Sequence, residues 1–347
     1  MSPAKTQSDA VELPHPRETF ALFGHAEAER ALLDEYRSGR IAHAWLIGGP
    51  AGIGKATLAY RMARFVLAHP DPKPDAVQRA ASLDVASDSP VARRVAARAH
   101  PDLLVLEREP DEKTGKVRTV ITVDQVRRTV GFFGSTAGEG GWRVCIVDSA
   151  DELQYPQGSN ALLKVLEEPP PRSLFLVVSH APGRLLPTIR SRCRRLTLRP
   201  LGEADVIAAA RAALGAEADE SALPQAAAAA DGSVARAIAL SGGPQLALRD
   251  KVLDLLARLP ATDPRALHAL GDSLERASDD VFEIFIETAR NWLSARLDRG
   301  AEPARLDRLA EAWERLNRAA TDTETYNLER KPLVFNVFSL LAEAARG

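Results

Sequence analysis

The feature that most restricts the fold of this chain is a glycine-rich heptapeptide, GPAGIGK, which runs from Gly49 to Lys55. It follows the apolar run Ala44–Ile47 and opens the amphipathic pattern Lys55–Ala68. Glycines let a backbone approach a phosphate, the N–H groups at a helix start attract it, and a lysine can reach the outer phosphates. We therefore predict strand, phosphate-binding loop and helix, in that order; a chance glycine-rich turn is the alternative. The predicted nucleotide-binding residues of this loop are Gly49, Gly52, Gly54 and Lys55.

Short β-rich runs alternate with helical patterns from Thr19 to Leu201. This alternation predicts an α/β domain around a parallel sheet that helices cover on both faces. The predicted strands are Ala44–Ile47, Leu103–Leu106, Arg143–Val147, Leu174–Ser179 and Arg195–Leu198. The stretch His69–His100 breaks the alternation, and we interpret it as an insertion.

Strand signals disappear after Pro200. Three Ala-rich helical patterns follow, up to Gly243, and from Gln245 onward four or five amphipathic helices are expected. The predicted segments are a flexible tail over residues 1–18, an α/β nucleotide-binding domain over 19–201, a helical lid over 202–243 and a helical collar or oligomerisation domain over 244–347.

The apolar residues of the predicted collar are numerous. We expect more of them than a small bundle buries internally, so that part should face other chains. These residues include Phe282, Phe285, Trp292, Trp313, Leu333 and Phe338.

Composition excludes several classes of protein. A net charge of −2 with 27% charged residues argues against a chain that binds polyanions over its whole surface. The two cysteines, Cys145 and Cys193, lack the spacing of a disulfide framework or a zinc site. No run of 18 apolar residues and no secretory leader pattern occurs. We expect a cytoplasmic protein that binds no zinc and does not associate with a membrane.

The phosphate loop lacks one expected hydroxyl. A complete P-loop has Ser or Thr after its lysine to bind Mg²⁺, and this chain has Ala56 there. Thr57 follows, but one residue further along a helix it is rotated by about 100°. We therefore expect no Mg²⁺ site, and we keep Thr57 as a candidate nucleotide-binding residue.

A second nucleotide element is the apolar run Arg143–Val147, which ends in Asp148 where an acid would hold the metal or its waters. The run resembles the Walker B strand of AAA+ proteins, whose active members have Glu at the next position. This chain has Ser149 there. Asp151 and Glu152 lie beyond the strand end, and we interpret them as solvated loop acids, with replacement of the missing base as the minor alternative.

Two further segments resemble the bacterial clamp-loader AAA+ subunits. SNALLKVLEEPP, from Ser159 to Pro170, is similar to their helix after Walker B, and Ser191–Cys193 is similar to their SRC motif. The resemblance covers Phe23 to Leu201, while the C-terminal half matches only in helical character. It implies a hetero-pentameric ring in which Arg192 acts in trans as an arginine finger on ATP held by the neighbouring subunit. The alternative is a surface arginine in a basic cluster with Arg190, Arg194, Arg195 and Arg199.

Within that family the chain is most similar to the delta-prime type of DNA polymerase III subunit. The motor subunits, gamma/tau, have a complete P-loop, an Asp-Glu pair and a zinc-binding Cys cluster, which this chain lacks. The resemblance implies a part in ATP-dependent loading of the sliding clamp onto primed DNA, with gamma/tau, delta, the clamp and primer-template DNA as partners. ATP or ADP is the implied ligand, and own ATPase activity is expected to be weak or absent.

The resemblance also assigns residues around the nucleotide. Ser179 matches the sensor-1 neighbourhood, with His180 as the alternative. In ATP-hydrolysing relatives the sensor-2 arginine falls where this chain has Ala235, so Arg236 is expected to point away from the site. Three other functions stay open: a gamma/tau-like motor, an autonomous ATPase, and a purely structural collar protein whose loop binds nothing.

Overall fold

The computed structural model describes residues 14–111, 115, 117–134, 138, 141–242, 244–297, 303–326 and 328–345. Residue contacts divide the chain into two compact units, Met1–Ile238 and Ala239–Gly347. None of the helices among the described residues is long and apolar enough to cross a membrane.

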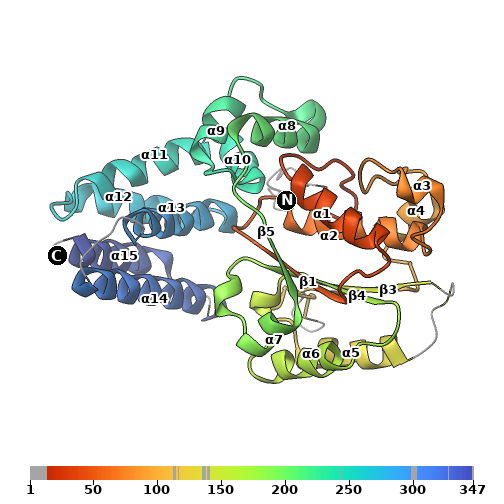
Figure 1. The fold of residues 1–347 in the computed structure, drawn as a ribbon. Coiled ribbons are helices and arrows are strands. Elements are labelled where there is room, and N and C mark those ends of the chain that lie inside the picture. The colour runs from red at the N-terminus through yellow and green to blue at the C-terminus, as the bar shows by residue number, and fades with distance from the viewer. Residues whose placement is uncertain are drawn as a thin grey trace, which may run out of the picture. The chain divides into compact units, whose positions relative to one another are not determined.

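The first unit is built on a five-stranded parallel sheet (Figure 1). Its strands are β1 (Ala44–Gly48), β2 (Leu103–Leu106), β3 (Arg143–Val147), β4 (Ser173–Ser179) and β5 (Arg194–Thr197), in the order β2-β3-β4-β1-β5. Each predicted strand is confirmed to within one residue at either end. In the pairing of β1 with β4, Gly48 lies opposite Ser179, so the two central strands end at the same edge. Open parallel sheets bind ligands at that edge.

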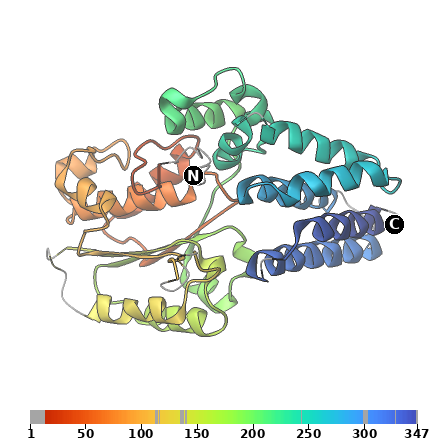
Figure 2. The ribbon, with the colours of Figure 1, turned by 180° about the vertical axis from the view of Figure 1, so that it is seen from behind.

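Helices cover both faces of this sheet (Figures 1 and 2). On one face lie α1 (Ala26–Arg37), α2 (Lys55–Ala68), α3 (Asp75–Gln78) and α4 (Pro90–Ala96); on the other lie α5 (Val123–Gly134), α6 (Gln157–Glu167) and α7 (Pro187–Arg192). Short 3₁₀ turns, η1 (Ala150–Glu152) and η2 (Pro182–Arg184), follow β3 and β4.

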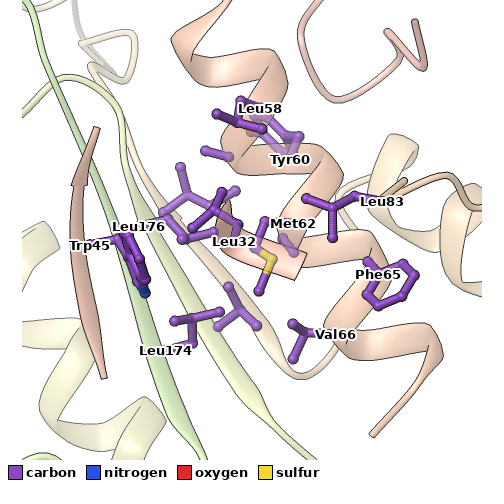
Figure 3. Close-up of a cluster of buried hydrophobic side chains, with 14 of the residues drawn as sticks. Leu32, Trp45, Leu58, Tyr60, Met62, Phe65, Val66, Leu83, Leu174 and Leu176 are labelled. Atoms are coloured by element: carbon purple, nitrogen blue, oxygen red, sulfur yellow. The ribbon is translucent and has the colours of Figure 1, made fainter. Parts of the chain in front are cut away.

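Each strand divides its side chains between two cores, because successive residues point to opposite faces. Trp45 and Ile47 of β1 belong to the core beneath α1 and α2, whereas Leu46 belongs to the core beneath α5 and α6. Figure 3 shows the first of these cores, with Met62 of α2 facing Leu176 of β4. Both faces of the sheet are therefore shielded from water. This explains why the sequences of the central strands are continuous apolar runs.

The predicted insertion, residues 69–100, contributes to this core. It contains α3 and α4, and Val77, Leu83 and Val95 from it are buried against the α2 side of the sheet. The stretch is thus an integral part of the first unit.

The predicted lid helices are α8 (Glu203–Leu214), α9 (Leu223–Ala229) and α10 (Val234–Ser241), with the 3₁₀ turn η3 (Gly215–Glu217) between the first two. Small apolar clusters hold them together, one of them built from Leu201, Val206, Ala227, Ala230 and Ala237. The contact division assigns α8 and α9 to the first unit and falls within α10.

The second unit is a bundle of α11 (Pro244–Ala257), α12 (Pro264–Glu275), α13 (Asp279–Leu297), α14 (Pro303–Tyr326) and α15 (Arg330–Ala345). The apolar residues named above from the predicted collar lie in the core of this bundle. Phe282, Phe285, Trp292, Leu333 and Phe338 are buried there, and Trp313 packs against them. Helices of 19 and 24 residues bring enough surface to bury these side chains within the bundle. That part of the bundle faces other chains stays a prediction.

Candidate nucleotide-binding site

A cavity of about 630 Å³ lies at the carboxyl edge of the sheet. The phosphate loop and the start of α2 line it, with residues 14–16, residues 18–23 and the lid helices α8 and α10 as further walls. Apart from the loop it is mainly apolar, with Phe20, Leu22, Ala213 and Ile238 among its lining residues. A cavity with one polar end and an otherwise apolar lining suits a nucleotide, because the phosphates need polar partners and the base packs against apolar side chains.

The loop has the conformation that a phosphate requires. Gly52 and Gly54 adopt φ values of +73° and +96°, which side chains rarely allow. Because α2 begins directly afterwards, its first N–H groups have no acceptor within the helix. The loop and helix start therefore fit a phosphate.

Lys55 lies at this phosphate end with only 3% of its surface exposed, and its Nζ donates to the carbonyl of Pro50. Burial lowers the pKa of Lys55 to about 8, although the carboxylates of Asp148 and Asp151 act in the opposite direction. Thr57 also lines the cavity. The ammonium is thus placed where it can meet an anion.

The same residues do not fit Mg²⁺. Ala56 lines the cavity but has no oxygen to offer. Asp148 lines it too, and burial, with the nearby carboxylate of Glu107, raises the pKa of Asp148. Over the described part of the chain, no group of three or more His, Cys, Asp or Glu side chains could hold a metal ion. Cys145 and Cys193 are both buried thiols.

Asp151 is exposed, as predicted for a loop acid, but the sequence did not reveal its hydrogen-bond partners. Its carboxylate accepts hydrogen bonds from Ser149 Oγ at 2.7 Å, Ser179 Oγ at 2.9 Å, His180 N at 2.5 Å and Ala181 N at 3.1 Å. Burial acts to raise the pKa of Asp151, but these bonds outweigh it and lower the pKa. A saturated carboxylate of lowered pKa is a structural tie between the ends of β3 and β4, and it is a poor general base.

Glu152, the other acid considered there, forms an ion pair with Arg108 at 3.0 Å. It is therefore also engaged within the unit.

Gly49 and Ser179 were predicted to bind nucleotide, yet neither is among the described residues that line the cavity. The N–H of Gly49 donates to the carbonyl of Ser179 at 3.3 Å, which ties the loop to β4. The Ser179 side chain is fully buried against Asp151. His180, the alternative, does line the cavity, and burial together with the positive charge of Lys55 lowers its pKa.

The lid is joined directly to the phosphate loop. The carbonyl of Gly52 accepts a hydrogen bond from Val234 N at 2.9 Å and a longer one from Ala235 N at 3.4 Å, so the loop caps the start of α10. A Cβ atom on Gly52 would lie 2.2 Å from Ser233 Oγ. Arg236 forms an ion pair with Asp231 at 2.8 Å and is not among the described lining residues.

The N-terminal wall of the cavity includes residues that the sequence assigned to a flexible tail. Of that tail, residues 1–13 lie outside the described residues, whereas 14–16 and 18 line the cavity. Two buried arginines of α2 hold this wall by its backbone. Arg64 donates to the carbonyls of Arg17 at 2.9 Å and Thr19 at 2.7 Å, and Arg61 donates to the carbonyl of Phe20.

This wall corrects the predicted boundary at Thr19, because the chain joins the folded unit at least five residues earlier. The sequence did hold one signal of it. Arg61 and Arg64 lie on a helix whose other buried residues are almost all apolar, and buried guanidinium groups need acceptors.

Arg192 lies apart from this cavity, at the end of α7. Its guanidinium donates to Glu167 Oε1 at 2.7 Å and to the carbonyl of Thr188 at 3.0 Å, and the side chain is 33% exposed. Arg199, from the basic cluster of the alternative interpretation, is exposed.

Residues 24–202, slightly more than half of the chain, match the sequence profile of the family described as DNA polymerase III, delta subunit. The chain belongs to this family. Curated relatives support the delta-prime type. A DNA polymerase III subunit delta' of Pseudomonas aeruginosa is 43% identical over 152 residues, covering 44% of this chain and 42% of that protein.

Two other members of the DNA polymerase III subunits match more distantly. The Escherichia coli K12 subunit delta' is 33% identical over 169 residues, covering 49% of this chain and 46% of that protein. A gamma/tau subunit of Mycobacterium bovis is 33% identical over 166 residues, covering 47% of this chain and 25% of that protein. The chain spans less than half the length of these relatives.

Solved structures are more remote. A gamma-subunit-related protein of Thermotoga maritima matches with a TM-score of 0.41 and 16% identity, covering 90% of this chain and 99% of that one. The Thermotoga maritima RuvB branch-migration motor matches with the same TM-score and identity, covering 82% and 80%. At this level of similarity, these structures add nothing to the description of the fold given above.

Proposed function

We propose that the chain serves as the delta-prime-type subunit of a clamp loader, in a ring with gamma/tau and delta subunits. In this role it assists ATP-dependent loading of the sliding clamp onto primed DNA, in the cytoplasm. Membership of the DNA polymerase III delta subunit family and the two delta' relatives support the proposal.

One observation carries the proposed division of labour. Arg192 is not among the described residues that line the chain's own cavity, and its guanidinium is partly exposed at the end of α7. An arginine in that position has no phosphate of its own chain to act on. A neighbouring subunit's ATP is the target that its permanent charge and forked donors suit.

The chain's own cavity supports binding of ATP or ADP without hydrolysis. Gly52, Gly54 and Lys55 supply the phosphate end of the cavity. Their presence favours a bound ligand over a purely structural protein whose loop binds nothing. Ala56 provides no Mg²⁺ ligand, and the Ser149 hydroxyl is engaged by Asp151. Those two positions argue against a gamma/tau-like motor and against an autonomous ATPase.

The test is the Arg192→Ala variant in the reconstituted complex. We expect lower ATPase activity with normal assembly, because arginine fingers contribute roughly 10³–10⁵ in rate at the site they serve. The loss for the whole ring is smaller, since other sites keep their own fingers. Arg192→Lys should also fail, because an ammonium cannot reproduce the planar fork.

Arg199→Ala is the matched control, since it removes the same charge from the same basic segment. It should be nearly silent. Equal losses in both variants, or loss of assembly with Arg192→Ala, would show that Arg192 belongs to a general basic interface.

A further inference from the structure

We propose that the cavity selects a nucleoside diphosphate over the corresponding triphosphate and holds it without Mg²⁺. This inference rests on the proposed nucleotide binding and specifies its ligand. It concerns how many phosphates the charges around Lys55 can neutralise.

Positive charge at the phosphate end is limited. Lys55 is the only Lys or Arg among the described residues that line the cavity. Together with the loop and the N-terminus of α2 it forms one compact anion site. In a complete P-loop the hydroxyl after the lysine brings Mg²⁺ to the last two phosphates. Ala56 removes that contribution, so the terminal phosphate of a triphosphate has to be held by the protein alone.

A smaller polar chamber of about 360 Å³ adjoins the main cavity, with which it shares His15, Asp148 and His180. Two arginines line it, but both are already paired. Arg98 contacts Glu107 at 2.5 Å and Arg108 contacts Glu152 at 3.0 Å. With Asp148 as a third acid, three carboxylates face two arginines, and the chamber has a formal excess of one negative charge at neutral pH.

The two serine hydroxyls at the ends of β3 and β4 are engaged elsewhere. The side chains of Ser149 and Ser179 both donate to Asp151. Asp148 lines both the main cavity and the chamber, so an added terminal phosphate that entered the chamber would meet this acid without a metal ion between them. Like charges repel, and a diphosphate, which is one phosphate shorter, avoids that encounter.

The experiment is calorimetric titration of the full chain with ADP and ATP, in excess EDTA and in excess Mg²⁺. In EDTA we expect ADP to bind about tenfold more tightly than ATP, from one added charge repulsion. Mg²⁺ should not strengthen the binding of either nucleotide. Tighter or equal binding of ATP, or a Mg²⁺-dependent gain in ATP affinity, overturns the inference.

Two variants of the same charge change locate the effect. Asp148→Asn should raise the affinity for ATP toward that for ADP. Glu217→Gln, which removes an exposed acid that is not among the described lining residues of the cavity, should leave the ratio unchanged. The assignment to Asp148 is contradicted if the ratio of ADP affinity to ATP affinity is unchanged in Asp148→Asn, or if it changes equally in both variants.

A third variant, Ala56→Ser, restores the missing hydroxyl and should make ATP affinity depend on Mg²⁺. If neither nucleotide binds the wild-type chain, nucleotide binding itself and this inference fail together. The Arg192 experiment is unaffected by that outcome, so the trans-acting role is tested separately.

Discussion

Ser179 Oγ donates a hydrogen bond to Asp151 Oδ1 at 2.9 Å, which turns this hydroxyl away from the cavity and into the junction between β3 and β4. Because Ser149 donates to the same carboxylate, one acid engages two residues to which an ATPase would give catalytic tasks. These hydrogen bonds stabilise the carboxyl edge of the sheet, and they leave neither serine hydroxyl available for catalysis.

Asp151→Asn should lower the free energy of unfolding by about 1 kcal/mol at neutral pH. An amide cannot accept all four hydrogen bonds, but water replaces part of them at this exposed residue. The pKa of Asp151 is lower in the folded protein than its ordinary value of 3.8. Its stabilisation is therefore present above that pH and is lost as the pH falls further. Denaturant unfolding of both proteins across this range checks it; Glu168→Gln is the neutral control. A difference that persists unchanged in strong acid contradicts the electrostatic explanation.

Gly52→Ala should destabilise the first unit more than Gly39→Ala does. Both glycines have left-handed φ values, +73° and +68°, but a Cβ at Gly39 meets nothing within 4 Å. Gly39→Ala thus reports the backbone cost alone, about 1–2 kcal/mol. Gly52→Ala adds a clash with Ser233 and Ala235. We expect a further 1–3 kcal/mol, roughly, and faster hydrogen exchange at Val234 N. Equal effects would mean that the lid does not rest on the loop.

Nucleotide affinity should fall as pH rises from 7 to about 9. The pKa of Lys55 is lowered to about 8 by burial, so the free protein loses the ammonium in this range. A bound phosphate favours the charged form, so binding takes up a proton. Calorimetry in buffers of different ionisation enthalpy measures that uptake. Lys55→Met should bind weakly with no alkaline decline; a decline that survives this substitution assigns it to another group.

The isolated chain should hydrolyse ATP negligibly, because Ala56 offers no Mg²⁺ ligand and Asp151 is committed to four donors. Steady-state phosphate release with and without Mg²⁺ is the measurement. Brisk Mg²⁺-dependent turnover that Lys55→Ala abolishes would contradict this expectation.

A chain shortened after Gly243 should keep a folded first unit. The apolar clusters of the sheet and lid draw on residues up to Ile238, while the bundle cluster begins at Leu248. Thermal unfolding followed by circular dichroism should remain cooperative. If the bundle is the oligomerisation domain that the sequence predicts, the shortened chain fails to co-purify with its partner subunits. Normal co-purification would reject that role.

The strands of the sheet could be predicted because each is specified by residues that are neighbours in the sequence. Continuous apolar runs such as Arg143–Val147 identify strands buried on both faces, and the glycine loop fixes which of them comes first. The polar end of the site could be predicted for the same reason, since Gly52, Gly54 and Lys55 are neighbours in sequence.

The rest depends on contacts between distant residues. The hydrogen bonds of Asp151 could not be predicted, because the Ser179, His180 and Ala181 donors lie 28 to 30 residues further along the chain. Arg192 could be singled out only by its resemblance to the SRC motif. Its partner Glu167 is 25 residues away, and no local pattern pairs them.

The anchoring of residues 17–20 by α2 matters to anyone who chooses a fragment of this protein. Arg64 is 2% exposed and contacts the carbonyls of Arg17 and Thr19. A gene trimmed to begin at Thr19, the boundary that the sequence suggests, removes the Arg17 carbonyl and leaves one nitrogen of a buried guanidinium without its acceptor. Such a fragment should express poorly or aggregate, and the fault would lie in where it was cut.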